Sequence, residues 1–268
     1  MYLRFIPFKS KEFISLNSLG ELKVKKAKKE IKIGLLQTKE CVFIDRRGWS
    51  EKEFKINDNL HSIGDKPAYV RESDVKAIWY KNGKIHRDEK NRGITMPAVI
   101  DQVYLCCKWY KNGKLHRIDK YNGLTLPAII YETGTQEWYR NGYRCRNDKD
   151  EFGYSLPNYI GNSHSKEWLN QNSQPSRVEK DINGFTLPAI ICNNAKEWWK
   201  NGKKHRDDKI DGITLPAVMY DNGNKEWWMN GLLHRERDIN LKLLPAIEYS
   251  NRREYWVNGN QINKCIIL

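Results

Sequence analysis

A motif that recurs about every 30 residues constrains the fold of this chain more than any other feature of its sequence. Its first part reads Trp-x-x-Asn-Gly-x-x-His-Arg, its second part reads Gly-x-x-Leu-Pro-Ala, and the clearest copies begin at Trp79, Trp109, Trp198 and Trp227. The turn position recurs at intervals of 25 to 30 residues, at Asn57, Asn82, Asn112, Asn141, Gln171, Asn201, Asn230 and Asn258. A near-constant period in this range indicates an array of stacked repeats.

The first part of the motif predicts a β-hairpin. Asn-Gly between aromatic and β-prone residues is a strong hairpin signal, because both turn positions need positive φ. In the copy at Trp198 the strands are predicted over Lys196–Lys200 and Lys203–Arg206. A two-residue loop fixes the register, which places Trp opposite His and Glu opposite Arg, and directly opposed side chains interact. The predicted pairs are Trp79 with His86, Trp109 with His116, Trp198 with His205, Trp227 with His234, Glu197 with Arg206, and Glu226 with Arg235.

The second part of the motif predicts a loop followed by a strand. The stretch after His-Arg is polar and contains Asp and Gly, so we interpret it as a loop. Leu-Pro-Ala then opens an apolar strand, as in Leu215–Tyr220, because proline is tolerated at the first residue of a strand. With Asn222-Gly223 as the next loop, Val218 lies opposite Trp227. Each repeat therefore contributes about three short strands to a continuous meander, in which the third strand of one copy pairs with the first strand of the next.

The predicted fold class is all-β, an elongated antiparallel β-meander or repeat array of about eight units. Residues 51–268 form the array, and residues 1–50 form a basic N-terminal β cap or arm. The copies are unequal. In the copy at Trp168, Gln171-Asn172 replaces Asn-Gly, Pro175-Ser176 replaces His-Arg, and Asn158 stands in place of Ala before it. This erosion is compatible with a kink, a binding site or neutral drift.

The recurring His, Arg and Asp residues invite an enzymatic interpretation, since His and Asp can act as an acid–base pair. Catalysis, however, needs one asymmetric set of groups, whereas this set is repeated. We therefore predict no catalytic residue, no metal site and no cofactor, and a structural role in which His stacks on Trp and Arg pairs with a carboxylate in the loop. A hydrolase in the eroded copy, near His164 and Glu167, is the minor alternative.

A second aromatic position follows the Trp, at Tyr80, Tyr110, Tyr139, Trp199 and Trp228. These rings either cover the apolar residues opposite them, at Ile85, Leu115 and Leu233, or form an exposed row that stacks bases or binds protein. The first interpretation is favoured, because large aromatic rings supply the core of a thin structure.

The formal charge of the chain is +14, and residues 1–50 hold twelve Lys and Arg against five Asp and Glu. A patch of this kind can meet nucleic acid, an anionic membrane surface or an acidic protein. The candidate contacts are Lys23, Lys25, Lys26, Lys28, Lys29 and Lys32. No stretch has the length of a transmembrane segment. The six cysteines form no Cys-x-x-Cys pair, so reduced thiols and an intracellular location are expected.

The repeated pattern of Trp, Tyr or Trp, Asn-Gly, His-Arg and Leu-Pro-Ala resembles the MORN-variant repeats that are abundant in large DNA viruses and occur in related bacterial proteins. The resemblance covers about residues 54–268. It implies a β-hairpin array that mediates protein–protein or membrane-proximal contacts without catalysis, with capsid or assembly proteins as partners, and a location in the virion or the host cytoplasm. The expected function is a non-enzymatic scaffold and minor structural or cement component of a virus particle. The alternative is a nucleic-acid or anionic-surface binder that uses the basic N-terminal segment.

Overall fold

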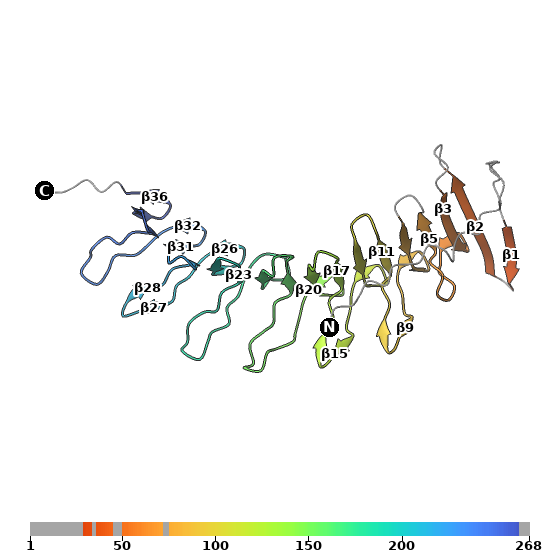
Figure 1. Cartoon of the computed structure of the whole chain (residues 1–268), viewed down its shortest axis with the longest axis horizontal. Coiled ribbons are helices and arrows are strands. Elements are labelled where there is room, and N and C mark those ends of the chain that lie inside the picture. Colours follow the sequence, from red (N-terminus) through yellow and green to blue (C-terminus); the bar gives the residue numbers. More distant parts are fainter. Residues whose placement is uncertain (1–28, 34–35, 45–49, 72–74, 263–268) are drawn as a thin grey trace. The chain divides into compact units, whose positions relative to one another are not determined.

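The computed structural model describes residues 29–33, 36–44, 50–71 and 75–262 (Figure 1). Within these ranges every regular element is a short β-strand and every pairing is antiparallel, so the predicted all-β class is confirmed. Contacts divide the chain into two units. The first comprises the described residues up to Lys114 together with Ile130–Thr133, and the second comprises Leu115–Ile129 and the residues from Gly134 onward.

The copy that begins at Trp198 shows the three parts of a repeat. The first is the Asn-Gly hairpin, formed by β25 (Trp199–Lys200) and β26 (Lys203–Lys204). A second hairpin follows, formed by β27 (Lys209–Ile210) and β28 (Ile213–Thr214). Leu-Pro-Ala then leads into β29 (Val218–Tyr220), which turns back into β30 (Lys225–Glu226) before the next Trp. We call the strands that follow Leu-Pro-Ala or precede the Trp, such as β29 and β30, ladder strands.

The ladder strands pair across repeats. β24 (Ala195–Glu197) pairs with β29, β29 pairs with β30, and β30 pairs with β33 (Ile247–Tyr249). The predicted pairing of the third strand of one copy with the first strand of the next is thereby confirmed. The predicted antiparallel meander is confirmed for the ladder strands, whereas each Asn-Gly hairpin forms a separate two-stranded sheet, because the chain changes partner at the Trp. The Trp198 N–H donates to the ladder carbonyl of Ala217, whereas the Trp198 carbonyl accepts from His205 in the hairpin.

The loop between ladder strands differs from the prediction by one residue. Val218 lies opposite Glu226 rather than Trp227. The reason is a three-residue loop, 221–223, which is closed by a bond from the Tyr220 N–H to the Asn224 carbonyl and in which Gly223 has a φ of 87°. A positive φ at the last loop residue is typical of three-residue hairpin loops.

The polar stretch after His-Arg is a hairpin, so the prediction of a loop there is wrong. Lys209 pairs with Thr214 and Ile210 with Ile213, around an Asp211-Gly212 turn in which both residues have positive φ. Two copies in the middle of the chain have longer turns at this place, and isolated bridges join Lys149 to Ser155 and Lys180 to Thr186. A β-turn of Asp-Gly type satisfies backbone groups that an irregular loop would leave to solvent.

The first unit contains three opening strands, then ladder strands, hairpin strands and one second hairpin. The opening strands are β1 (Lys29–Ile33), β2 (Leu36–Ile44) and β3 (Ser50–Ile56). The ladder strands are β5 (Tyr69–Arg71), β6 (Lys76–Ile78), β11 (Val99–Asp101) and β12 (Cys106–Lys108). The remaining strands are β4 (Asn59–Leu60), β7 (Tyr80–Lys81), β8 (Lys84–Ile85), β9 (Lys90–Asn91), β10 (Ile94–Thr95) and β13 (Tyr110–Lys111).

The second unit repeats the same parts. Further ladder strands are β18 (Gln136–Glu137), β21 (Tyr159–Ile160), β22 (Lys166–Glu167), β23 (Ile190–Cys192) and β34 (Arg252–Glu254). Further Asn-Gly hairpin strands are β19 (Tyr139–Arg140), β20 (Tyr143–Arg144), β31 (Trp228–Met229), β32 (Leu232–Leu233), β35 (Trp256–Val257) and β36 (Asn260–Gln261). A further second hairpin consists of β15 (Lys120–Tyr121) and β16 (Leu124–Thr125). β14 (Lys114–Leu115) and β17 (Ile129–Tyr131) span the boundaries between the two units.

The core of the regular repeats is the motif Trp packed near the Ala of Leu-Pro-Ala. Trp198 and Trp227 are buried, and Ala217 and Ala246 have no exposed surface. The indole N–H is also satisfied, since Trp227 Nε1 donates to the Thr214 carbonyl of the preceding copy at 2.8 Å. Buried Trp normally finds such a partner. The motif Trp therefore supplies both the apolar core and a hydrogen bond between neighbouring repeats.

Candidate functional site

The Arg of His-Arg is the polar centre of each repeat. Arg206 is buried, and its guanidinium lies over the Trp198 ring, 4.0 Å from the ring centroid. Arg206 Nε donates to Asp208 at 2.9 Å, and Nη1 donates to the Pro216 carbonyl at 3.2 Å. One side chain thus stacks on the core Trp, neutralises a carboxylate and holds the Leu-Pro-Ala segment in place.

The same arrangement recurs in other copies of the motif. A guanidinium lies 3.6 to 4.1 Å from the ring centroid in the pairs Arg87 with Trp79, Arg146 with Trp138, Arg177 with Trp168, and Arg235 with Trp227. The carboxylate two residues after Arg is paired with it in Glu89, Asp119, Asp148 and Glu179. The predicted Arg–carboxylate tie is confirmed for Asp119, and the other paired acids share its position in the motif.

Two predicted pairs are wrong. Arg206 does not bond Glu197, because the hairpin ends at Trp198 and His205 and the Arg206 N–H donates instead to Trp228 of the next copy. Glu226 likewise does not bond Arg235. Arg235 Nη1 donates to Glu248 at 2.7 Å, whereas Glu226 accepts from Trp228 Nε1 at 2.8 Å.

The paired carboxylates are held in their charged form. Burial alone raises the pKa of Asp208, but the hydrogen bonds from Arg206 and Thr186 outweigh burial and leave that pKa below its usual value. The pKa of Asp148 is lowered in the same way by Arg146 and Thr125, again against the effect of burial. These groups are therefore structural ion pairs and not proton carriers near neutral pH.

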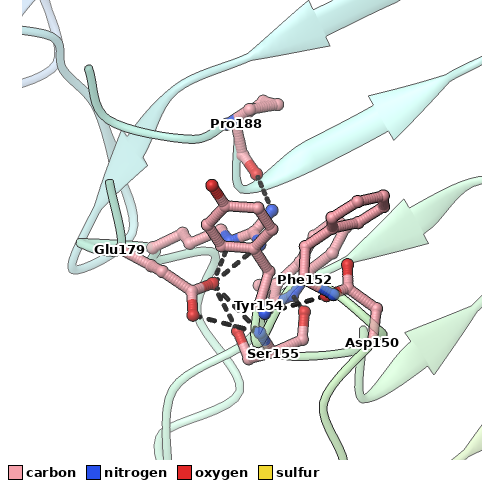
Figure 2. Close-up of polar contacts among 8 residues, drawn as sticks. Asp150, Phe152, Tyr154, Ser155, Glu179 and Pro188 are labelled. Carbon is pink, nitrogen blue, oxygen red and sulfur yellow. Dashed lines mark hydrogen bonds and ion pairs between the residues drawn. The ribbon is translucent and has the colours of Figure 1, made fainter. Parts of the chain in front are cut away.

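A Thr or Ser before Leu-Pro joins consecutive second hairpins. Thr186 Oγ1 donates to Asp208 at 2.8 Å, and Thr125 Oγ1 donates to Asp148 at 2.7 Å. Figure 2 shows the equivalent contact of Ser155 with Glu179, in which the Ser155 hydroxyl donates at 2.9 Å. The sequence carries this signal as Gly-x-Thr-Leu-Pro, and the prediction missed it.

The motif His connects neighbouring Asn-Gly hairpins, and the prediction that it stacks on Trp is replaced by this role. His205 donates its backbone N–H to Trp198 as the register requires, but its Nδ1 accepts the N–H of Asn230 in the next copy at 3.2 Å. The ring face of Trp198 is taken by Arg206. His61, His86, His116 and His234 make the same bond with the Asn of the following turn, at 3.0 to 3.2 Å. Trp109 is buried, like Trp79, and donates Nε1 to Thr95.

A second bond accompanies each His contact. The turn Gly donates its N–H to the carbonyl of the residue before His in the preceding copy, as from Gly231 to Lys204 at 2.9 Å. Equivalent bonds start at Gly83, Gly113, Gly142, Gly202 and Gly259, at 2.8 to 2.9 Å. Stacked hairpins therefore repeat one connection, in which the turn of each copy is bound by the copy before it.

This connection is interrupted at the eroded copy. Cys145 stands at the His position, and no backbone bond within the described part of the chain joins the 170–174 turn to the Trp138 copy. The turn holds one extra residue, so Ser176 takes the His position and Arg177 takes the Arg position, 4.0 Å over Trp168. The predicted replacement of His-Arg by Pro175-Ser176 is therefore shifted by one residue. Downstream the stack resumes, since Ser176 Oγ accepts the Asn201 N–H at 3.1 Å.

The second aromatic position is half-buried and bonded. Tyr80 lies opposite Ile85 and Trp228 lies opposite Leu233, as predicted. Trp199 Nε1 donates to Glu197 at 2.7 Å, and Tyr139 donates its hydroxyl to Glu137 at 3.0 Å. In the eroded copy Leu169 holds this position and cannot donate, and burial raises the pKa of the neighbouring Glu167.

The predicted anionic-partner contacts lie mostly outside the described residues. Lys23, Lys25, Lys26 and Lys28 fall within residues 1–28, and Lys29 and Lys32 lie in β1, where their backbones pair with Glu40 and Gln37 of β2. Among the described residues, no group of three His, Cys, Asp or Glu is placed to hold a metal ion. No helix of the described part has the length and apolarity to cross a membrane.

Comparisons with known proteins give no relative. No protein-family model matches the chain, no curated protein matches it, and no solved structure matches it. The interpretation of the repeats therefore depends on the residues themselves.

Proposed function

We propose that the chain is a non-enzymatic repeat scaffold that mediates protein–protein contacts, as a minor structural or cement component of a large DNA virus particle. The observation that carries the proposal is that the His, Arg and acidic residues of the motif are all engaged in structural bonds. In the described repeats His bonds the next turn, Arg bonds Trp, Pro and a carboxylate, and that carboxylate bonds Thr.

Groups committed in this way are poor catalysts. A general base must reach the proton it removes, and a carboxylate with a lowered pKa between Arg206 and Thr186 is already saturated with donors. Repetition of the set supports the same conclusion, because each copy meets only its neighbours, as in other repeat scaffolds. The viral setting rests on the resemblance of the motif alone.

The test is co-fractionation of the full chain with assembled particles from its source, followed by cross-linking from a photoreactive residue at the exposed Tyr143 position. A scaffold should sediment with the particles at fixed stoichiometry and form adducts with a small set of proteins. Recovery only as free protein, without adducts, would contradict the proposal. A matched photoreactive substitution at the buried Val218 should give no adducts in either case.

The alternative function is binding to nucleic acid or an anionic membrane surface. It is supported by the excess of twelve basic over five acidic residues in residues 1–50. The two functions differ in their response to salt, since displacement of counterions makes the second one strongly salt-dependent.

A further inference from the structure

The second hairpins of the second unit expose apolar side chains at their tips. Ile182 is 91% exposed, Ile239 79%, Phe152 75% and Leu241 74%. The tips of the two hairpins with two-residue turns add Tyr121, Leu124, Ile210 and Ile213, each more than a third exposed. We call these eight residues the apolar tip row. Contiguous apolar exposure on this scale is unusual for a monomer and marks an interaction surface.

Hydrogen bonds near their bases hold consecutive second hairpins side by side within the second unit. Thr125 bonds Asp148, Ser155 bonds Glu179, and Thr186 bonds Asp208, so each second hairpin is tied to the next. At the last junction Lys209 pairs with Glu236, and a Cβ on Gly212 would lie 3.4 Å from Ile239. The apolar tip row is therefore one surface carried by five consecutive hairpins.

Backbone strain supports a role for this surface. Asp150, Asp181 and Asp238 cap three equivalent turns, each accepting two backbone N–H bonds, and Figure 2 shows Asp150 beneath the turn that exposes Phe152. The left-handed position of these turns is Gly153 in the first and Gly184 in the second, but Leu241 with a φ of 60° in the third. A non-glycine residue there is strained, and strain is retained where it serves a purpose.

We propose that the apolar tip row is an interface between two copies of this chain. Its side chains together offer on the order of 1,000 Å², the scale of one partner's share of a stable interface. Four of the five tips hold residues of both charge signs, namely Lys149 and Glu151, Lys180 and Asp181, Lys209 and Asp211, and Lys242 and Asp238. A neutral surface of mixed sign is complementary to itself, as a two-fold contact between identical copies requires.

Other occupants fit this surface less well. An acidic residue adjoins four of the eight tip residues, and the capping carboxylates of Asp150, Asp181 and Asp238 are fixed in the turns by backbone N–H groups. Insertion into a membrane would carry these carboxylates with it, and a neutral surface of mixed sign has no net attraction for an anionic headgroup or a phosphate backbone. Self-association goes beyond the scaffold function, and a monomeric chain that still joins a larger assembly would overturn only the present proposal.

Sedimentation velocity of the full chain over a wide range of concentration tests the proposal. The wild type should show a monomer–dimer equilibrium, and the double variant Phe152→Ser with Ile182→Ser should raise the dimer dissociation constant at least tenfold with an unchanged circular dichroism spectrum. Tyr143→Ser is the matched control, because Tyr143 is 60% exposed on an Asn-Gly hairpin of the same unit. A monomeric wild type, a double variant that dimerises normally, or an equal loss in the control would overturn the proposal.

Leu241→Gly separates association from folding. The substitution removes one apolar tip and relieves the strained φ, so the thermal midpoint measured on dilute, monomeric protein should rise while the dimer weakens. Loss of association in a variant that is more stable cannot be a consequence of unfolding. A Leu241→Gly chain that dimerises as tightly as the wild type would contradict the proposed interface.

Discussion

The imidazole Nδ1 of His205 accepts the backbone N–H of Asn230, which belongs to the next repeat, at 3.2 Å. Since a backbone N–H only donates, Nδ1 must be the unprotonated ring nitrogen, and Nε2 faces Asp207 at 3.3 Å. The bond gives the His of the motif an architectural role. It also defines a substitution series, because one copy of the array uses a hydroxyl for the same purpose.

His205→Ala should lower the free energy of unfolding by about 1 kcal/mol, the net value of one hydrogen bond. His205→Ser should lose less, because Ser176 Oγ already accepts the Asn201 N–H at the equivalent place. Urea unfolding followed by tryptophan fluorescence measures both variants. If the two substitutions lower the free energy of unfolding equally, His205 does not stabilise the protein through its bond to the following turn.

Arg206→Ala should be far more damaging, at about 3 to 5 kcal/mol, because it leaves Asp208 as an unpaired buried charge. The control is Arg252→Ala, which breaks the ion pair between an exposed arginine and Glu254 and should cost less than about 1 kcal/mol. Urea midpoints at neutral pH compare the two. Similar midpoints would show that burial of the Arg206 pair is energetically unimportant.

The array should lose stability in acid. The pKa values of Asp148, Glu179 and Asp208 are lowered by Arg and by Thr or Ser, against the effect of burial. A group with a folded-state pKa below its unfolded-state pKa stabilises the protein above the unfolded value and stops doing so as pH falls. Thermal midpoints should therefore drop below about pH 4. Asp208→Asn should be less stable at pH 7 and should change less on acidification than the wild type.

Asn158→Ala restores the motif residue, yet it should destabilise the protein by about 1 to 2 kcal/mol. In other copies the carbonyl at the Leu169 position accepts the Arg N–H of the preceding copy, as Trp199 accepts from Arg177. In the eroded copy Asn158 takes this place and bonds both the carbonyl and the N–H of Leu169, at 2.7 and 3.0 Å. Urea unfolding compares Asn158→Ala with Asn158→Asp, which keeps the acceptor oxygen but loses the amide donor and should lose less stability. An Asn158→Ala chain as stable as the wild type would refute this compensation.

Replacement of Lys23, Lys25, Lys26 and Lys28 by Gln tests the alternative function. If the basic segment binds nucleic acid, the four substitutions should weaken binding to a DNA duplex and reduce the slope of its salt dependence by up to about 4. Gel-shift measurements at several salt concentrations give the slope. As a control, Lys149, Lys180, Lys203 and Lys242 replaced by Gln remove the same charge elsewhere. Equal effects of the two sets would indicate non-specific attraction.

The sequence predicted the hairpins well where two residues decide the geometry. Asn201-Gly202 fixes the pairs Trp199 with Lys204 and Lys200 with Lys203, and both are observed. The same rule, applied to Asn122-Gly123 and Asp211-Gly212, would have identified the second hairpins. Glu197 and Arg206 could not be placed from local register, because the chain leaves the hairpin at Trp198 and takes its next partners from neighbouring repeats.

The missing connection between the Trp138 and Trp168 copies has a consequence for how the second unit unfolds. In a stack of repeats, cooperativity is the product of nearest-neighbour coupling, as in a one-dimensional chain of coupled spins. Where Cys145 stands for His and the extra residue displaces the turn, that coupling is reduced to the ladder, the links around Ser155 and the two bonds between Asn158 and Leu169. Unfolding that starts at one end of the unit should stop at this weak junction before it continues. The second unit should therefore unfold in two cooperative steps, although its ladder strands are continuous.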